Sequence, residues 1–101
     1  MNVIELFLPL DKGDGLPVDP ERIEALVKGL VDRFGGATAY TREPAEGMWK
    51  HSGAIEQDRI LIVEVVAKAV DDDWWAAYRE RLEAEFQQDE IMIRVIPCRL
   101  L

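Results

Sequence analysis

The sequence predicts a single α+β domain covering residues 1–101, with its elements in the order βαββαβ. Three observations predict this order. Apolar side chains alternate with other side chains in residues 2–10 and 55–67, at the period-two spacing of strands. Apolar side chains recur at helical spacing in a segment after each of these strands. A further strand-like segment follows each helix, so the chain divides into two strand-helix-strand units.

Length and composition limit the class of protein. A chain of 101 residues has room for one hydrophobic core. Hydrophobic residues make up 49% and charged residues 32%, a balance that supports a folded domain. The formal charge of −8 opposes phosphate backbones and anionic lipid, so no nucleic-acid or membrane partner is expected. Cys98 is the only cysteine, which excludes an intrachain disulfide and fits a cytoplasmic protein.

The first helix has recognisable start and stop signals. Residues 2–10 form the strand before it. Asp19 stands before Pro20, as is typical of a helix start, because Asp caps the first turn and Pro fits its first position. An apolar stripe then runs to Phe34, and Gly35 ends the helix.

The middle of the chain has less regular patterns. Residues 37–42 are short and moderately apolar and are expected to form the second strand. Proline and glycine interrupt residues 43–53, so we expect a loop there, within which residues 48–51 are a further candidate strand. Residues 55–67 then show the strongest strand pattern, with both faces at least partly apolar.

The last two elements are a helix and a strand. Asp71 is the expected cap of a helix whose apolar stripe runs from Trp75 to Gln87. Residues 91–96 are expected to form the last strand, which Pro97 ends.

This order is the split βαβ, or ferredoxin-like, arrangement. With the strand order 4-1-3-2, an antiparallel four-stranded sheet has both helices on one face and leaves its other face open. Alternation assigns these residues to the helix side: Ile4, Leu6, Leu8, Leu61, Val63, Val65, Ile91, Ile93 and Val95. It assigns these to the open side: Val3, Glu5, Phe7, Ile60, Ile62, Glu64, Val66, Met92, Arg94 and Ile96. An apolar face this broad is rarely left in water, so we expect a homodimer that covers it.

Three charged side chains are expected near the middle of the open side. Glu5 and Glu64 are candidate catalytic bases of raised pKa, and Arg94 is a candidate group for holding an anionic substrate in a cavity between two subunits. The same residues also suit a dimer interface with cross-strand ion pairs. We favour the interface, because structural ion pairs perturb carboxylates as readily as active sites do.

The remaining candidates lie in the middle of the chain. His51 is the only histidine and is a third candidate base, although no cysteine or second histidine stands near it to form a metal site. Tyr40 and Trp49 join Arg94 as candidate ligand-binding residues. Trp49 is also a suitable packing anchor for its loop.

The acidic motifs have structural explanations, and no metal or cofactor is expected. Residues 11–15 depart from the spacing of a calcium loop and match turn chemistry. Residues 71–73 suit a helix N-terminus, where the cap and the helix dipole favour acidic side chains.

Four short motifs resemble a family of small bacterial proteins of unknown function, over residues 37–96. They are Gly47-Met48-Trp49-Lys50, Gly53-Ala54-Ile55-Glu56, Ala77-Tyr78-Arg79 and Phe86-Gln87-Gln88-Asp89. The resemblance implies the same fold and brings no activity or catalytic residue. The topology is also similar to that of dimeric α+β barrel proteins, which include monooxygenases, isomerases and ligand-sensing domains.

Two hypotheses of function follow. The first is a non-enzymatic homodimeric domain that uses its open sheet face to bind a partner or a small-molecule ligand. The alternative is a cofactor-independent enzyme of the isomerase or monooxygenase type, with Glu5, Glu64 or His51 as base in a cavity on that face.

Overall fold

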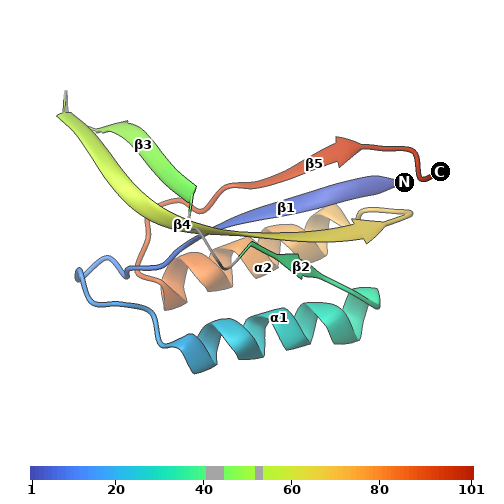
Figure 1. The fold of residues 1–101 in the computed structure, drawn as a ribbon, viewed down its shortest axis with the longest axis horizontal. Coiled ribbons are helices and arrows are strands. Elements are labelled where there is room, and N and C mark those ends of the chain that lie inside the picture. Colours follow the sequence, from blue (N-terminus) through green and yellow to red (C-terminus); the bar gives the residue numbers. More distant parts are fainter. Residues whose placement is uncertain (41–44, 52–53) are drawn as a thin grey trace.

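A computed structural model describes residues 1–40, 45–51 and 54–101. Within residues 45–51 and 54–58 the description covers the backbone and, among side chains, only that of Met48. The elements in chain order are β1 (Asn2–Pro9), α1 (Pro20–Phe34), β2 (Thr38–Ala39), β3 (Ala45–His51), β4 (Ala54–Ala67), α2 (Asp72–Glu85) and β5 (Ile93–Pro97). Figure 1 shows both helices beneath one face of the sheet.

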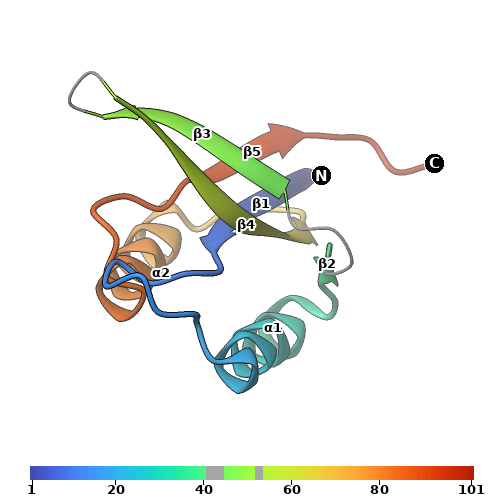
Figure 2. The ribbon, with the colours of Figure 1, turned by 60° about the vertical axis from the view of Figure 1, so that its left-hand side comes forward.

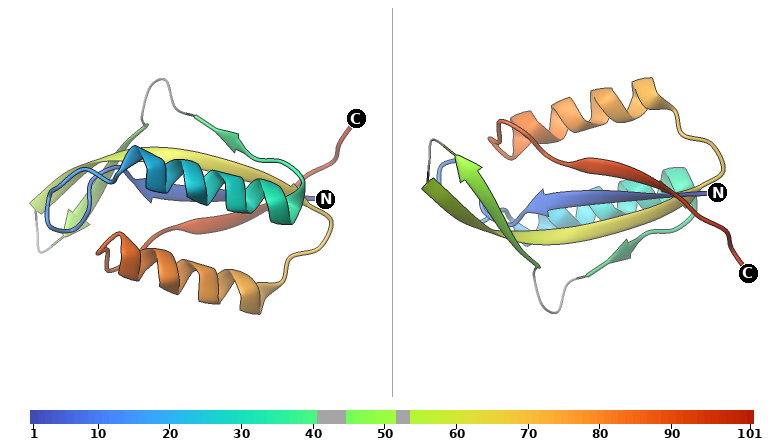
Figure 3. Two further views of the ribbon diagram at one scale, coloured as in Figure 1. Left: turned by 90° about the horizontal axis from the view of Figure 1, so that it is seen from below. Right: turned by 90° about the horizontal axis from the view of Figure 1, so that it is seen from above.

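The sheet has the expected order and direction. The strands run β2-β4-β1-β5, each pair antiparallel, and β3 pairs with β4 beyond β2. With β2 and β3 sharing the position of the second strand, this is the 4-1-3-2 order, and the ferredoxin-like prediction is confirmed. Seen from the side opposite the helices, β1, β4 and β5 lie uncovered by either helix (Figure 3).

The second strand differs most from the prediction. β2 contains only Thr38–Ala39, and residues 41–42 of the predicted strand lie outside the described residues. The candidate strand at residues 48–51 is confirmed, but it begins earlier than expected, because β3 covers Ala45–His51 and pairs with β4 from Ala45 opposite Ile60 to His51 opposite Ala54. The predicted loop is therefore wrong for residues 45–47. The reason is the length of β4, because β1 covers only its second half and the first half needs another backbone partner.

Smaller differences occur at the ends of α2 and β5. α2 ends at Glu85, two residues before the predicted end, and Gln87 takes a left-handed conformation with φ of 55°. β5 begins at Ile93, so the buried side chain of Ile91 lies before the strand. Both boundaries shift because the connection turns immediately after α2.

Both helices are capped as predicted. The Asp19 carboxylate accepts a hydrogen bond from the Glu21 amide at 2.9 Å, and Gly35 closes α1 with a φ of 83°. The Asp71 carboxylate accepts from the Trp74 amide at 3.1 Å, which confirms that the acidic run begins with a helix cap. None of the helices in the described ranges is both long and apolar enough to span a membrane.

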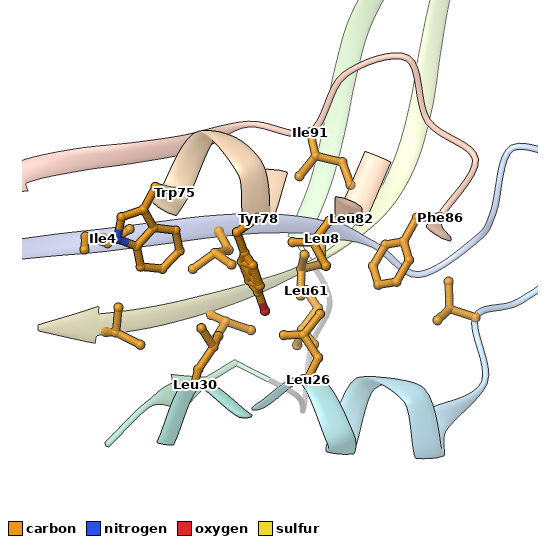
Figure 4. Packing of buried hydrophobic residues seen from close by; sticks show 14 residues of the cluster. Ile4, Leu8, Leu26, Leu30, Leu61, Trp75, Tyr78, Leu82, Phe86 and Ile91 are labelled. Carbon is orange, nitrogen blue, oxygen red and sulfur yellow. The ribbon is translucent and has the colours of Figure 1, made fainter. Parts of the chain in front are cut away.

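The core lies between the helices and the helix side of the sheet (Figure 4). The predicted strand residues are buried there: Ile4, Leu6, Leu8, Leu61, Val63 and Val65. From the helices they meet Leu26, Leu30, Trp75, Tyr78, Leu82 and Phe86. Val95 lies in register with the buried Ile4, as predicted for the helix side, but it stays exposed because β5 is an edge strand.

The loop after β1 has the predicted turn chemistry. The Asp14 carboxylate accepts from the Leu16 amide at 2.9 Å, and Gly15 has a φ of 84°. Asp11 binds Arg59 of β4 with 2.9 Å between carboxylate oxygen and guanidinium nitrogen, and this contact lowers the pKa of Asp11. The loop is therefore held to the sheet by its own acidic residue.

Candidate functional site on the open sheet face

We define the open face by the side chains that point away from the helices along the paired strands. They are Val3, Glu5 and Phe7 of β1, Ile62, Glu64 and Val66 of β4, and Arg94 and Ile96 of β5. Figure 2 shows that the helices lie on the other side of the sheet. Ile60 continues this row by register, as alternation predicts, but its side chain is buried, where β4 passes between Pro9 and Ala45.

The predicted charged residues form one row across three strands. Glu5 pairs in register with Glu64 on β4 and with Arg94 on β5. The Arg94 Nε donates to Glu5 Oε1 at 2.7 Å. The Glu5 side chain is 12% exposed and that of Arg94 is 55% exposed, so the carboxylate lies deep in the face and the guanidinium lies over it.

An aromatic ring completes this ion pair. The Arg94 guanidinium lies 5.0 Å from the centre of the Phe7 ring, within range of a cation–π interaction. Phe7 was placed on the open side by alternation, but its contact with Arg94 was not predicted. Phe7 stands two residues from Glu5, which is the partner of Arg94 in register. Side chains at such diagonal positions on neighbouring strands can interact, and this spacing was the signal that could have predicted the contact.

Glu64 has a different partner, Tyr40. Glu64, as a hydrogen-bond acceptor for the hydroxyl and then through its negative charge, raises the pKa of Tyr40 above its ordinary value. The Tyr40 amide donates to the Ile62 carbonyl at 3.0 Å, so the residue stays bonded to β4 just beyond β2. Each of the two facing carboxylates therefore has its own partner, which permits like charges to stand opposite each other.

The structure brings together four of the predicted site residues and separates two. Glu5, Glu64, Arg94 and Tyr40 share the open face. Trp49 and His51 lie on the hairpin of β3 and β4, and their side chains are outside the description. His51 pairs with Ala54, about 30 Å along β4 from Glu64 at the usual rise per residue, so the backbone does not bring it to the charged row.

The charged and apolar side chains of the open face are arranged as in a sheet face that another surface can cover. Glu5 is neutralised within the face by its ion pair with Arg94, and Glu64 lies beside the hydroxyl group of Tyr40. Val66 and Ile96 beside them remain exposed. Among the described residues no cluster of His, Cys, Asp or Glu could hold a metal ion.

A separate apolar groove lies on the helix side, between α1 and β4. It has a volume of about 430 Å³ and is lined chiefly by apolar side chains, among them Val18, Ile23, Val27 and Leu61. Glu24 provides a charged group in its wall, and Tyr40 connects its border to the open face.

The sheet order, the two helices on one face and the open opposite face define the ferredoxin-like class of α+β proteins. Similar solved structures agree with this class. The divalent cation tolerance protein CutA1 of Thermus thermophilus is 16% identical with a TM-score of 0.62, covering 97% of this chain and 84% of that one. CutA1 of Pyrococcus horikoshii is 19% identical with a TM-score of 0.59, covering 100% of this chain and 86% of that one.

A phage SAM lyase in complex with S-methyl-5'-thioadenosine is also similar. It is 15% identical with a TM-score of 0.61, covering 94% of this chain and 79% of that one. At these identities the similarities show the fold alone. No family model and no curated protein matches the sequence, so the resemblance over residues 37–96 stays a prediction.

Proposed function

We propose that the protein is a homodimeric binding domain whose two copies pair through their open faces. The observation that carries this proposal is an apolar sheet face whose deepest carboxylate, Glu5, is already paired with Arg94. A desolvated carboxylate is costly unless it is paired, and Glu5 meets that condition before a second copy arrives, while Glu64 has the hydroxyl group of Tyr40 beside it.

The charge of the open face supports self-association further. The chain has a net charge of −8, which makes two copies repel each other. The row of Glu5, Glu64 and Arg94 holds two negative groups and one positive group, so most of the excess charge lies elsewhere. A twofold pair that buries this face brings together a row with one excess negative charge in each copy.

The test replaces valine by aspartate at two positions where the side chains are equally exposed. Val66 on the open face is 40% exposed and Val31 on α1 is 39% exposed. We expect sedimentation equilibrium to find a dimer for the wild type. Val66→Asp should raise its dissociation constant at least tenfold, because two unpaired carboxylates would be buried at the interface.

Val31→Asp is the control and should leave the dimer unchanged. Circular dichroism checks that both variants keep the fold. A monomeric wild type, or equal effects of the two substitutions, would contradict pairing through the open face.

The contact between Tyr40 and Glu64 favours a second candidate function, the binding and conversion of a small molecule. Tyr40 carries its proton at neutral pH, as tyrosine ordinarily does, and Glu64 further raises its pKa, so the hydroxyl group is a hydrogen-bond donor beside an acceptor carboxylate. A neighbouring donor and acceptor suit the hydroxyl groups of a ribose. The similar phage SAM lyase holds a nucleoside thioether, which makes that class of ligand the first to test.

Calorimetric titration with S-methyl-5'-thioadenosine tests this second candidate. We expect binding to the wild type, and affinity at least tenfold lower in Glu64→Gln, which keeps the shape and removes the charge. Glu80→Gln on the outer side of α2 is the matched control and should bind like the wild type. Absence of binding to the wild type would argue against a nucleoside site.

A further inference from the structure

The groove between α1 and β4 lies beside the end of β2 at Ala39. Leu61, which pairs with the buried Leu8 of β1, contributes to its wall from β4. Val18, Ile23 and Val27 form the side nearest α1. At about 430 Å³ the groove is large enough for a small ligand or a few side chains.

A second unmatched apolar surface follows β5. Leu100 is 60% exposed and Leu101 is exposed as well, and Arg99 precedes them. Figures 2 and 3 show this segment projecting beyond the end of the sheet, away from both helices. Two adjacent leucines held away from the body leave apolar surface in water that a groove could cover.

This segment cannot reach the groove of its own chain. Pro97 pairs with Asn2, whereas Leu61 of the groove pairs with Leu8, which lies about 20 Å further along β1 at the usual rise per residue. β5 runs away from the groove, and the four residues after Pro97 extend at most about 14 Å. Any contact between the two surfaces therefore joins two copies.

We propose that Arg99, Leu100 and Leu101 of one copy bind in the groove of a second copy. The leucines contact the apolar wall, and Arg99 lies beside Glu24. Glu24 already pairs with Lys28 at 3.2 Å, but both side chains are well exposed and the carboxylate can accept from a second cation. The contact places the exposed leucines against apolar side chains and places the positive charge of Arg99 beside the carboxylate of Glu24.

This contact is separate from the open-face pairing proposed above. It joins two different surfaces, so a twofold pair makes it twice, and a pair without that symmetry repeats it in rings or chains. Both proposals predict self-association, and different substitutions test them.

Charge reversal tests the groove contact by sedimentation velocity on the full chain. Glu24→Arg and Arg99→Glu should each weaken association about threefold or more, since each places like charges together. The double variant should recover most of the wild-type association, because the pair is restored with opposite polarity. Asp32→Arg, the same charge change on α1 away from the groove, should not be rescued by Arg99→Glu.

Leucine substitutions give an independent readout. Leu100→Ser combined with Leu101→Ser should weaken association, whereas Leu16→Ser should not, although Leu16 is 59% exposed.

The outcomes distinguish the two proposals. If Glu24 and Arg99 show no rescue and the leucine change has no effect while Val66→Asp still dissociates the protein, the groove contact is wrong and open-face pairing stands. If the rescue occurs and Val66→Asp has no effect, the groove contact stands and open-face pairing is wrong. A wild type that remains monomeric at its highest soluble concentration overturns the groove contact.

Discussion

Gly13 lies where the loop after β1 meets the end of α2. Its amide donates to the Phe86 carbonyl at 3.2 Å, and a Cβ atom at this position would overlap the backbone carbonyl oxygen of Gln87. Glycine is therefore required at position 13 because the backbone of the loop lies too close to the backbone of Gln87 for a side chain. We predict that Gly13→Ala lowers the free energy of unfolding by about 1–3 kcal/mol, because the loop or the end of α2 must move.

Gly29 is the matched control, with the opposite expected sign. It lies within α1, and a Cβ atom there meets no other atom within 4 Å. Gly29→Ala should raise the free energy of unfolding by about 0.5–1 kcal/mol, because alanine has the higher helix propensity. Urea denaturation measures both changes. Equal effects of the two substitutions would mean that the loop adjusts to a methyl group without cost.

The charged residues of the open face illustrate what alternation predicts at this scale. Period-two spacing placed Glu5, Glu64 and Arg94 on one face, because side chains alternate strictly along strands. It did not predict that Tyr40 binds Glu64. That contact depends on where β2 ends and on the backbone bond from Tyr40 to β4, which are tertiary features.

At the scale of elements, local chemistry predicted the helices best. Asp19 with Pro20 at one helix start, and Asp71 at the other, act within a single turn of backbone, so neighbouring residues contain the whole signal. The end of α2 was less predictable, because no glycine marks it and Gln87 takes the left-handed conformation instead.

β3 was predicted only in part, as the candidate strand at residues 48–51 within an expected loop. Glycine and proline around it are typical of a loop, and its apolar pattern is short. Its strand conformation results from the length of β4, whose first half extends beyond β1 and forms a hairpin with Ala45–His51. A strand that forms to satisfy a partner's backbone groups has a weak signal of its own. The same hairpin carries Trp49 and His51 away from the charged row, which alternation alone cannot reveal.

At the scale of the whole molecule, the two sides of the sheet differ in what covers them. The helix side is filled by one continuous core, in which Leu6 and Val63 are fully buried. The open side has apolar groups of the same kind, such as Val66, without a covering layer. The asymmetry follows from the order of the elements, since both crossover helices of a split βαβ fold lie on the same face. Association is the simplest way for such a molecule to complete its second layer.

The net charge of −8 predicts how this association depends on salt. Two acidic copies repel each other over long range, and the Debye length falls from about 10 Å at 0.1 M salt to about 3 Å at 1 M. The apolar contacts of the open face are not weakened by screening, so the association constant should rise several-fold between roughly 0.05 M and 0.5 M sodium chloride. Sedimentation equilibrium at matched protein concentrations measures this change. Association that weakens with salt would show that pairs of opposite charge hold the copies together, and the open face would then lose its place as the principal interface.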